Sequence, residues 1–167
     1  MSDLPERRGK GRRWLRLAAK TLHDVASIGF GGALASCLVI NAVANRALAA
    51  EFEASRRLYA AIARYLLVPS MFVVVVTGLI ALVATRAYME AGWAWLKALL
   101  GLSVFEATLL VVGSGQRSAE LVASAADPSA IDAMLRAERN TLWLLIAVSV
   151  ANVALAVWRP RLTTKGR

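Results

Sequence analysis

One histidine, His23, stands at the start of the first long apolar segment, and it is the side chain best suited to chemistry. A neutral imidazole binds haem iron through a ring nitrogen, and it also gains and loses protons near physiological pH. His23 is therefore a candidate axial haem ligand or proton carrier. The structural alternative is an interfacial histidine bonded to a backbone carbonyl or to its neighbour Asp24.

Two charged residues lie within the third apolar segment. Lys97 is suited to pairing with a propionate, a quinone oxygen or a carboxylate, or it extends to lipid headgroups beside Trp93 and Trp95. Glu106 lies near the middle of the segment, where a charged group costs about 2.5–3.5 kcal/mol. Glu106 is a candidate proton site, or it hydrogen-bonds to Asn152 in the fourth segment, or it seals a subunit contact.

Other polar residues inside the apolar segments are candidates for a buried polar site. Asn41 lies in the first segment, Thr77 in the second, and Ser149 with Asn152 in the fourth. We expect hydrogen bonds between helices from these side chains, because lipid supplies no partner. The single cysteine, Cys37, excludes an intrachain disulfide and is expected to be a small core residue.

No sequence motif of a known catalytic site accompanies these residues. The chain has no CxxC, HExxH, Walker loop, GxSxG or paired histidines, which gives zinc proteases, nucleotide enzymes and serine hydrolases no support. Soft and imidazole ligands are nearly absent from the chain, so the sequence gives little support to a copper-handling function. A metal would therefore be bound by His23 alone, as a haem iron.

The composition predicts a membrane protein. Hydrophobic residues make up 58% of the 167-residue chain, and the mean hydropathy is +0.55. Four apolar segments approach the roughly 20 residues that cross a hydrocarbon core of about 30 Å. We therefore predict an all-α, four-helix integral membrane bundle in residues 21–158. The predicted spans are about 22–45, 60–84, 93–112 and 141–158, with basic tails at 1–20 and 159–167.

The first span carries a polar stripe. At 100° per residue, the five polar side chains of this stripe all fall within about 40° of His23, and we expect them to face helices or a ligand rather than lipid. They are His23, Ser27, Cys37, Asn41 and Asn45. Small residues beside the stripe are expected to let a neighbouring backbone approach closely. These are Gly29, Gly32, Ala33 and Ser36.

Other signals predict how the spans are connected. Residues 1–13 are expected to be poorly ordered, and residues 46–64 to form an aqueous connection that ends in an amphipathic approach to the membrane. Pro69 should kink the second span near its start. The sequence VGSGQR at 112–117 should break the third helix, and the Asp127-Pro128 dipeptide should begin a separate short helix.

The distribution of basic residues predicts the orientation. The two tails and the turn between the second and third spans carry twelve Lys and Arg, whereas the other two connections carry seven. The positive-inside rule therefore predicts that both termini are cytoplasmic. The net charge of +9 is better explained by anionic lipid headgroups than by nucleic acid, since no nucleic-acid-binding motif is present.

This topology places His23 and Lys97 at similar depth, because the first and third spans both begin on the cytoplasmic side. Each residue lies a few positions inside its helix. A cofactor, an anionic headgroup or a substrate carboxylate in the cytoplasmic half of the bundle would then contact both.

Short motifs in the first three spans follow one another in the same order as in a known group of proteins. The first span opens with Lys20-Thr-Leu-His23 and Ile28-Gly29-Phe30-Gly31-Gly32. The second carries Pro69-Ser70-Met71 and Thr77-Gly78-Leu79, and the third opens with Gly92-Trp93-Ala94-Trp95-Leu96-Lys97. Over about 90 residues, these motifs resemble the small membrane proteins grouped with the HemJ-type protoporphyrinogen oxidase and the copper resistance protein CopD.

The resemblance implies that His23 and Lys97 form a functional pair and that a b-type haem is bound. The HemJ-type enzyme has a further histidine late in its third helix, where this chain has Glu106-Ala-Thr108. The chain is therefore more similar to the uncharacterised bacterial integral-membrane relatives in this group.

Three functions follow as expectations. The first is a small inner-membrane binding or redox-accessory protein of a bacterium, with haem b or a related tetrapyrrole in a cytoplasm-side pocket. The second is a membrane enzyme of the protoporphyrinogen-oxidase type. The third is a structural or assembly subunit of a larger complex, as a homo- or hetero-oligomer. The sequence leaves open whether the protein is an enzyme.

Overall fold

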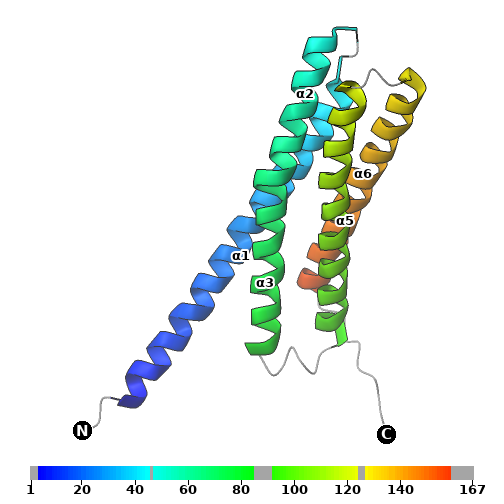
Figure 1. Cartoon of the computed structure of the whole chain (residues 1–167). Helices are drawn as coiled ribbons and strands as arrows, with labels where there is room; N and C mark the ends of the chain where they lie inside the picture. The colour runs from blue at the N-terminus through cyan, green and yellow to red at the C-terminus, as the bar shows by residue number, and fades with distance from the viewer. Residues whose placement is uncertain (1–3, 46, 85–91, 124–126, 159–167) are drawn as a thin grey trace, which may run out of the picture.

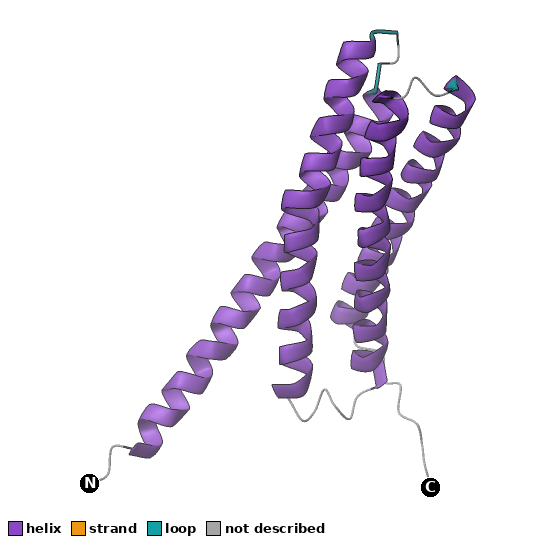
Figure 2. Cartoon of the chain, in the orientation of Figure 1, coloured by secondary structure: helices purple, strands orange, loops and turns teal. Residues whose placement is uncertain are grey.

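Every regular element in the described part of the chain is a helix. The computed structural model describes residues 4–45, 47–84, 92–123 and 127–158. In chain order, the elements are α1 (Leu4–Val43), α2 (Ala49–Ile62), the π-helical segment η1 (Ala63–Leu67), α3 (Val68–Ala84), α5 (Gly92–Ala123) and α6 (Pro128–Trp158). Figure 2 shows the helices and the short loops. The all-α prediction is confirmed.

These helices form four long rods, because α2, η1 and α3 continue directly into one another (Figure 1). Each rod is long and apolar enough to cross a membrane. α1 begins and α6 ends at the same end of the bundle, as an even number of crossings requires. The predicted four-helix bundle is confirmed.

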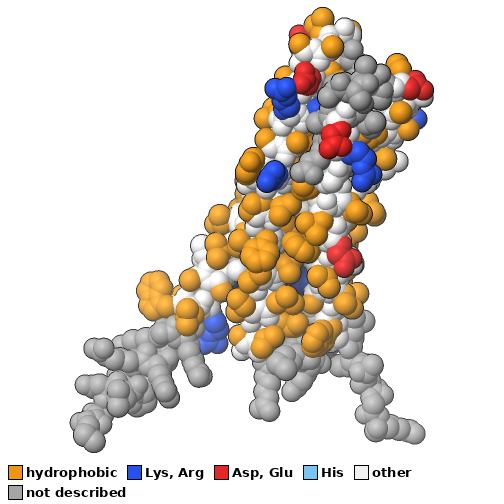
Figure 3. Space-filling view, viewed as in Figure 1, with side chains coloured by type: hydrophobic (Ala, Val, Ile, Leu, Met, Phe, Trp, Pro, Cys, Tyr) orange, Lys and Arg blue, Asp and Glu red, His pale blue; other side chains and the backbone are white. Residues whose placement is uncertain are grey.

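The core draws apolar side chains from all four rods. Its buried members are Phe30, Ala33, Leu34, Cys37, Tyr59, Ala63, Leu67, Met71, Val104, Val111, Leu142 and Leu145. The outward faces are apolar as well, and Figure 3 shows hydrophobic side chains over the body of the bundle, with many of the charged ones toward the end where α2 begins. Such a continuous apolar surface is suited to contact with acyl chains rather than with water.

Three helix boundaries differ from the predictions. α1 is already helical at Leu4, α5 continues through Gly113 to Ala123, and α6 runs unbroken from Pro128. A glycine within a helix costs only about 1 kcal/mol relative to alanine. Packing of α5 against both α6 and α2 offsets a cost of that size. The predicted break at 112–117 is therefore wrong.

α2 takes the place of most of the predicted aqueous connection. Phe52, Arg56 and Tyr59 recur at steps of four and three residues, and all three are buried. This spacing puts them on one face of a helix, and that face packs into the bundle. The connection between α1 and α2 is thus reduced to residues 44–48.

The irregularity expected at Pro69 takes the form of η1. Proline has no N–H to bond the carbonyl of residue 65, and its ring displaces that carbonyl. Directly before Pro69, the Val68 N–H bonds to the Ala63 carbonyl, five residues back, instead of to residue 64. The helix therefore widens locally and continues as α3.

α1 and α3 come close at Gly29. A Cβ atom there would lie 3.0 Å from Ser70 Oγ, whereas a Cβ at Gly32 would meet no atom within 4 Å. Ala33 is buried, but Gly32 and Ser36 are exposed. The buried face of α1 is centred on the core residues next to Ala33, so the expected close approach is wrong for Gly32 and Ser36.

We expect Gly29→Leu to lower the free energy of unfolding by about 1–3 kcal/mol, because the added side chain would displace the Ser70 side chain. Gly32→Leu is the matched control and should stay within about 0.5 kcal/mol of the wild type. Unfolding in mixed micelles, followed by circular dichroism, measures both. Equal losses at the two positions would contradict the packing.

Asp127 caps the start of α6. Its Oδ1 accepts a hydrogen bond from the Ser129 N–H at 3.1 Å, and its Oδ2 accepts one from the Ser129 hydroxyl at 2.7 Å. The predicted helix start at Asp127-Pro128 is confirmed, although the helix continues into the fourth span. The hydrogen bonds from Ser129 lower the pKa of the Asp127 carboxyl.

This cap predicts a pH dependence. A carboxyl whose pKa is lowered by folding stabilises the folded state above its ordinary pKa, and that stabilisation is lost as the pH falls through the folded value. Protection of the first turn of α6 should therefore be constant above about pH 5 and decline below about pH 4. Hydrogen exchange at the Ala130 and Ile131 amides, which bond to the Asp127 carbonyl, measures this protection. In Asp127→Asn, the decline should be absent.

Candidate functional site

His23 projects from α1 onto α3. Its Nδ1 lies 2.9 Å from Thr77 Oγ1 and 3.1 Å from the Val74 carbonyl oxygen. The Thr77 hydroxyl donates to the Val73 carbonyl at 2.6 Å, so its oxygen is left to accept from the ring. Because both partners then accept, Nδ1 carries the proton and Nε2 keeps its lone pair in the neutral ring.

Lys97 reaches the same region from α5. It is partly buried, α5 packs against α3, and the charge of Lys97 acts on the His23 ring. A Cβ atom at Gly78 of α3 would lie 3.6 Å from His23 Cε1, so α3 passes directly beside the imidazole. The region thus combines an oriented imidazole with a nearby ammonium group.

The polar stripe of α1 faces other helices at His23 and Asn41, and Cys37 between them is fully buried. Ser27 bonds within α1, to the His23 carbonyl at 2.8 Å. Asn45 lies past the end of the helix, where it is exposed and donates to Glu51 Oε2 at 3.3 Å. The polar stripe of α1 therefore faces other helices, and its last residue, Asn45, lies in the loop after α1.

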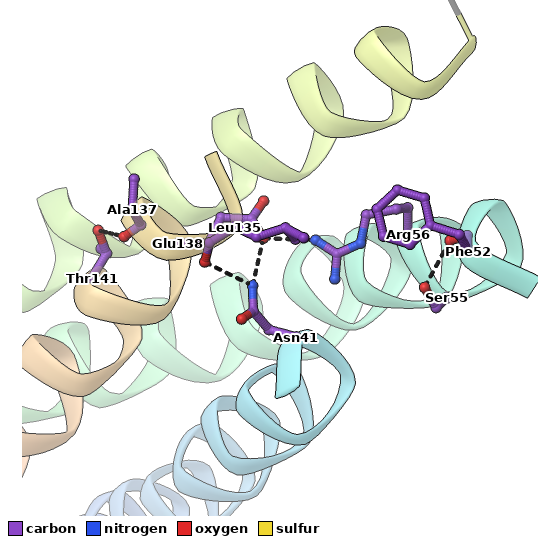
Figure 4. Close-up of polar contacts among 8 residues, drawn as sticks. All are labelled: Asn41, Phe52, Ser55, Arg56, Leu135, Ala137, Glu138 and Thr141. Atoms are coloured by element: carbon purple, nitrogen blue, oxygen red, sulfur yellow. Dashed lines mark hydrogen bonds and ion pairs between the residues drawn. The ribbon is translucent and has the colours of Figure 1, made fainter. Parts of the chain in front are cut away.

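A second polar group lies where Arg56 of α2 meets Glu138 of α6 (Figure 4). Arg56 Nη1 donates to Glu138 Oε2 at 2.6 Å, and the two side chains are 0% and 1% exposed. Asn41 Nδ2 donates to the same oxygen at 3.0 Å and to the Leu135 carbonyl at 3.2 Å. We call Asn41, Arg56 and Glu138 the buried polar triad.

Aromatic rings complete the surroundings of Arg56. The guanidinium carbon lies 4.7 Å from the Tyr59 ring centroid and 5.9 Å from that of Phe52, which are cation–π distances. Four polar atoms of the triad have no hydrogen-bond partner among the described residues: Arg56 Nε and Nη2, Asn41 Oδ1 and Glu138 Oε1. Pairing within the triad therefore runs through one nitrogen of Arg56 and one oxygen of Glu138.

Sequence analysis missed Arg56 and Glu138 as buried residues. Both lie in segments whose many charges indicated water. The available signal was helical spacing: Arg56 lies on the stripe with Phe52 and Tyr59, and Glu138 on one with Leu135 and Leu142. Opposite charges on two apolar stripes indicate a buried pair.

Glu106 and Asn152 are not brought together. Glu106 is exposed on the outer side of α5 and makes no hydrogen bond or ion pair with a described residue. Asn152 instead faces α5 at Gly101, where a Cβ atom would lie 4.0 Å from its Nδ2. Of the alternatives for Glu106, the hydrogen bond to Asn152 is therefore not formed, because Asn152 of α6 faces a different side of α5 from the one that carries Glu106.

Two cavities border the triad rather than His23. One, of about 250 Å³, is lined by Asn41, Asp132, Leu135, Arg136 and other residues of α1 and α6. The other, of about 310 Å³, lies between α5 and α6 and includes Glu138 in its lining. A group bound at His23 would therefore occupy neither of them.

His23 has few neighbouring side chains that could help it to bind a metal ion. In the described part of the chain, no three His, Cys, Asp or Glu side chains are grouped so that they could hold a metal ion. The site does offer one ring nitrogen with a free lone pair and one cation nearby. These fit a group that brings its own metal ligands and an anionic side arm, as a haem does.

Fold and site together define an all-helical bundle of the multi-pass membrane type, with an oriented histidine and a buried ion pair in different parts of the bundle. Comparisons with protein-family models, curated proteins and solved structures find no match to this chain.

Proposed function

We propose that the protein is a multi-pass inner-membrane protein that binds haem b or a related tetrapyrrole as a binding or redox-accessory module. His23 is its axial ligand through Nε2, and Lys97 pairs with a propionate. The observation that carries the proposal is the fixed orientation of the His23 ring, with Nδ1 committed to the Val74 carbonyl and Thr77.

That orientation is typical of metal-ligating histidines. Such residues donate the second ring N–H to a carbonyl or carboxylate, which fixes the tautomer and makes the ligating nitrogen more basic. The bound haem would supply one-electron chemistry, and the chain would supply the axial nitrogen, the ring orientation and the compensating charge.

The basic residues support a cytoplasmic location for both termini by the positive-inside rule. In that orientation, the His23 end of α1 lies toward the inner leaflet. The resemblance to the HemJ/CopD-like group is consistent with this arrangement, since it assigns the same pair of residues.

An optical spectrum tests the proposal. Protein extracted in mild detergent from haem-replete cells should show a Soret band whose position changes on reduction. His23→Ala should lose the band, and Gly32→Ala, at an exposed position with open space, should keep it. A wild-type preparation with no Soret band and no extractable tetrapyrrole would contradict the proposal.

A further inference from the structure

Glu106 lies on the outward face of α5, inside the apolar belt. It has no hydrogen-bond or ion-pair partner in the described part of the chain. The apolar runs 66–84 and 142–158 contain no Asp, Glu, Lys or Arg, so α5 carries an acid that the other two runs lack. Because acyl chains offer no donor to a carboxyl group, a partner for Glu106 must come from outside the described part of the chain.

The residues around Glu106 repeat at steps of three and four. The α5 seam, as we define it, consists of Leu99, Leu102, Glu106, Leu109 and Gly113. Its three leucines are 61%, 48% and 48% exposed, in that order. Alternating steps of this kind form the contact line of two helices that pack side by side with a small crossing angle.

The opposite side of α5 is already in use. Val104, Thr108 and Val111 are buried against the bundle, and at 100° per residue they lie across the helix from Glu106. The α5 seam is therefore a second contact line on the same helix. Its apolar residues are arranged like those of an interface, and its acid lies near the middle.

The end of the seam leaves room for a close approach. A Cβ atom at Gly113 would meet no atom within 4 Å. Leu109, Leu110 and Gly113 also line the cavity of about 310 Å³ between α5 and α6. A helix placed along the seam could insert side chains into this cavity.

We propose that a second copy of the chain packs along the α5 seam, about a twofold axis perpendicular to the membrane. Such an axis sets each seam residue against its own counterpart, so Glu106 meets the partner's Glu106. A protonated carboxyl group both donates and accepts, and two of them satisfy each other without any further residue type. One polar residue in an otherwise apolar seam also fixes the register of the two helices.

Cysteine cross-linking in liposomes tests the surface. In a Cys37→Ala background, single cysteines at Leu99, Leu102 and Leu109 should form disulfide-linked dimers on oxidation. Cysteines at the exposed positions Ile28 and Phe72, on α1 and α3, are matched controls and should not. Equal cross-linking at all five positions, or cross-linking at Ile28 alone, would overturn the proposal.

The carboxyl group is tested by measuring dimer affinity, with energy transfer between labelled copies at increasing lipid dilution. Glu106→Gln keeps a donor and an acceptor and should dimerise like the wild type. Glu106→Ala should weaken the dimer roughly 3- to 18-fold, the range found for hydrogen bonds between membrane helices. An unchanged affinity in Glu106→Ala would overturn the role of the carboxyl.

Two further outcomes are informative. His23→Ala should dimerise normally, because His23 lies on α1, away from the seam, so failure of haem binding does not affect this test. A different protein cross-linked to the seam in stoichiometric amount in native membranes, with no dimer of this chain, would overturn the proposal in favour of a hetero-oligomer.

Discussion

Glu138→Ala should lower the free energy of unfolding by about 3–5 kcal/mol, which is the cost of leaving a buried charge without its partner. The Arg56 guanidinium is completely buried, and Glu138 is the only carboxylate that binds it among the described residues. Asn41 would lose its side-chain acceptor at the same time. Denaturation with sodium dodecyl sulfate, followed by circular dichroism, measures the loss.

Two control variants distinguish the effect of breaking this buried ion pair from the effect of removing any charged residue. The double variant Arg56→Leu/Glu138→Leu removes both charges and should recover most of the lost stability, since replacing a whole buried pair by apolar residues is often neutral. Glu53→Gln breaks the exposed pair with Arg57 one turn away on α2 and should cost less than about 0.5 kcal/mol. A double variant as unstable as Glu138→Ala would contradict the explanation.

The second large effect concerns the histidine site. His23→Ala should abolish tetrapyrrole binding, because no other imidazole exists in the chain. Thr77→Val should weaken binding by about tenfold, the low end of the range for groups that orient a metal ligand, since the Val74 carbonyl still holds Nδ1. Titration of the apoprotein with haem, followed at the Soret band, measures both affinities.

Thr108→Val is the matched control for Thr77→Val. Both threonines donate to the carbonyl four residues earlier in their own helix, and the Thr108 hydroxyl bonds to the Val104 carbonyl at 2.7 Å. Only Thr77 also hydrogen-bonds to the His23 ring. Thr108→Val should therefore bind haem like the wild type. Equal losses in the two variants would indicate a general effect on the fold.

The fold was largely predictable because its main determinant is local. Long apolar runs determine the number of rods, and their lengths match a hydrocarbon core. The burial of the charged segments next to the apolar runs was harder to predict. Charges around Arg56 and Glu138 indicated water, but the burial of this pair depends on two residues that lie 82 positions apart. Helical spacing places each of the two residues on an apolar stripe, but it does not show which distant residue neutralises the charge.

At the histidine site, the residues were predictable from the sequence, but their contacts were not. The composition singles out His23, and a backbone carbonyl was among the partners weighed. That the carbonyl belongs to Val74, with Thr77 beside it, follows from the antiparallel register of α1 and α3. The same register sets Gly29 against Ser70. Registers between helices depend on the sum of many contacts, which a single sequence does not reveal.

The unbroken length of α1 has a mechanical consequence. Its 40 residues form a rod of roughly 60 Å, and this one rod carries both the basic stretch before Lys20 and the imidazole at position 23. No loop lies between them, so a rotation of the basic stretch about the helix axis would also rotate the imidazole. A partner that bound this stretch at the membrane surface and rotated it would therefore change the orientation of the imidazole relative to α3.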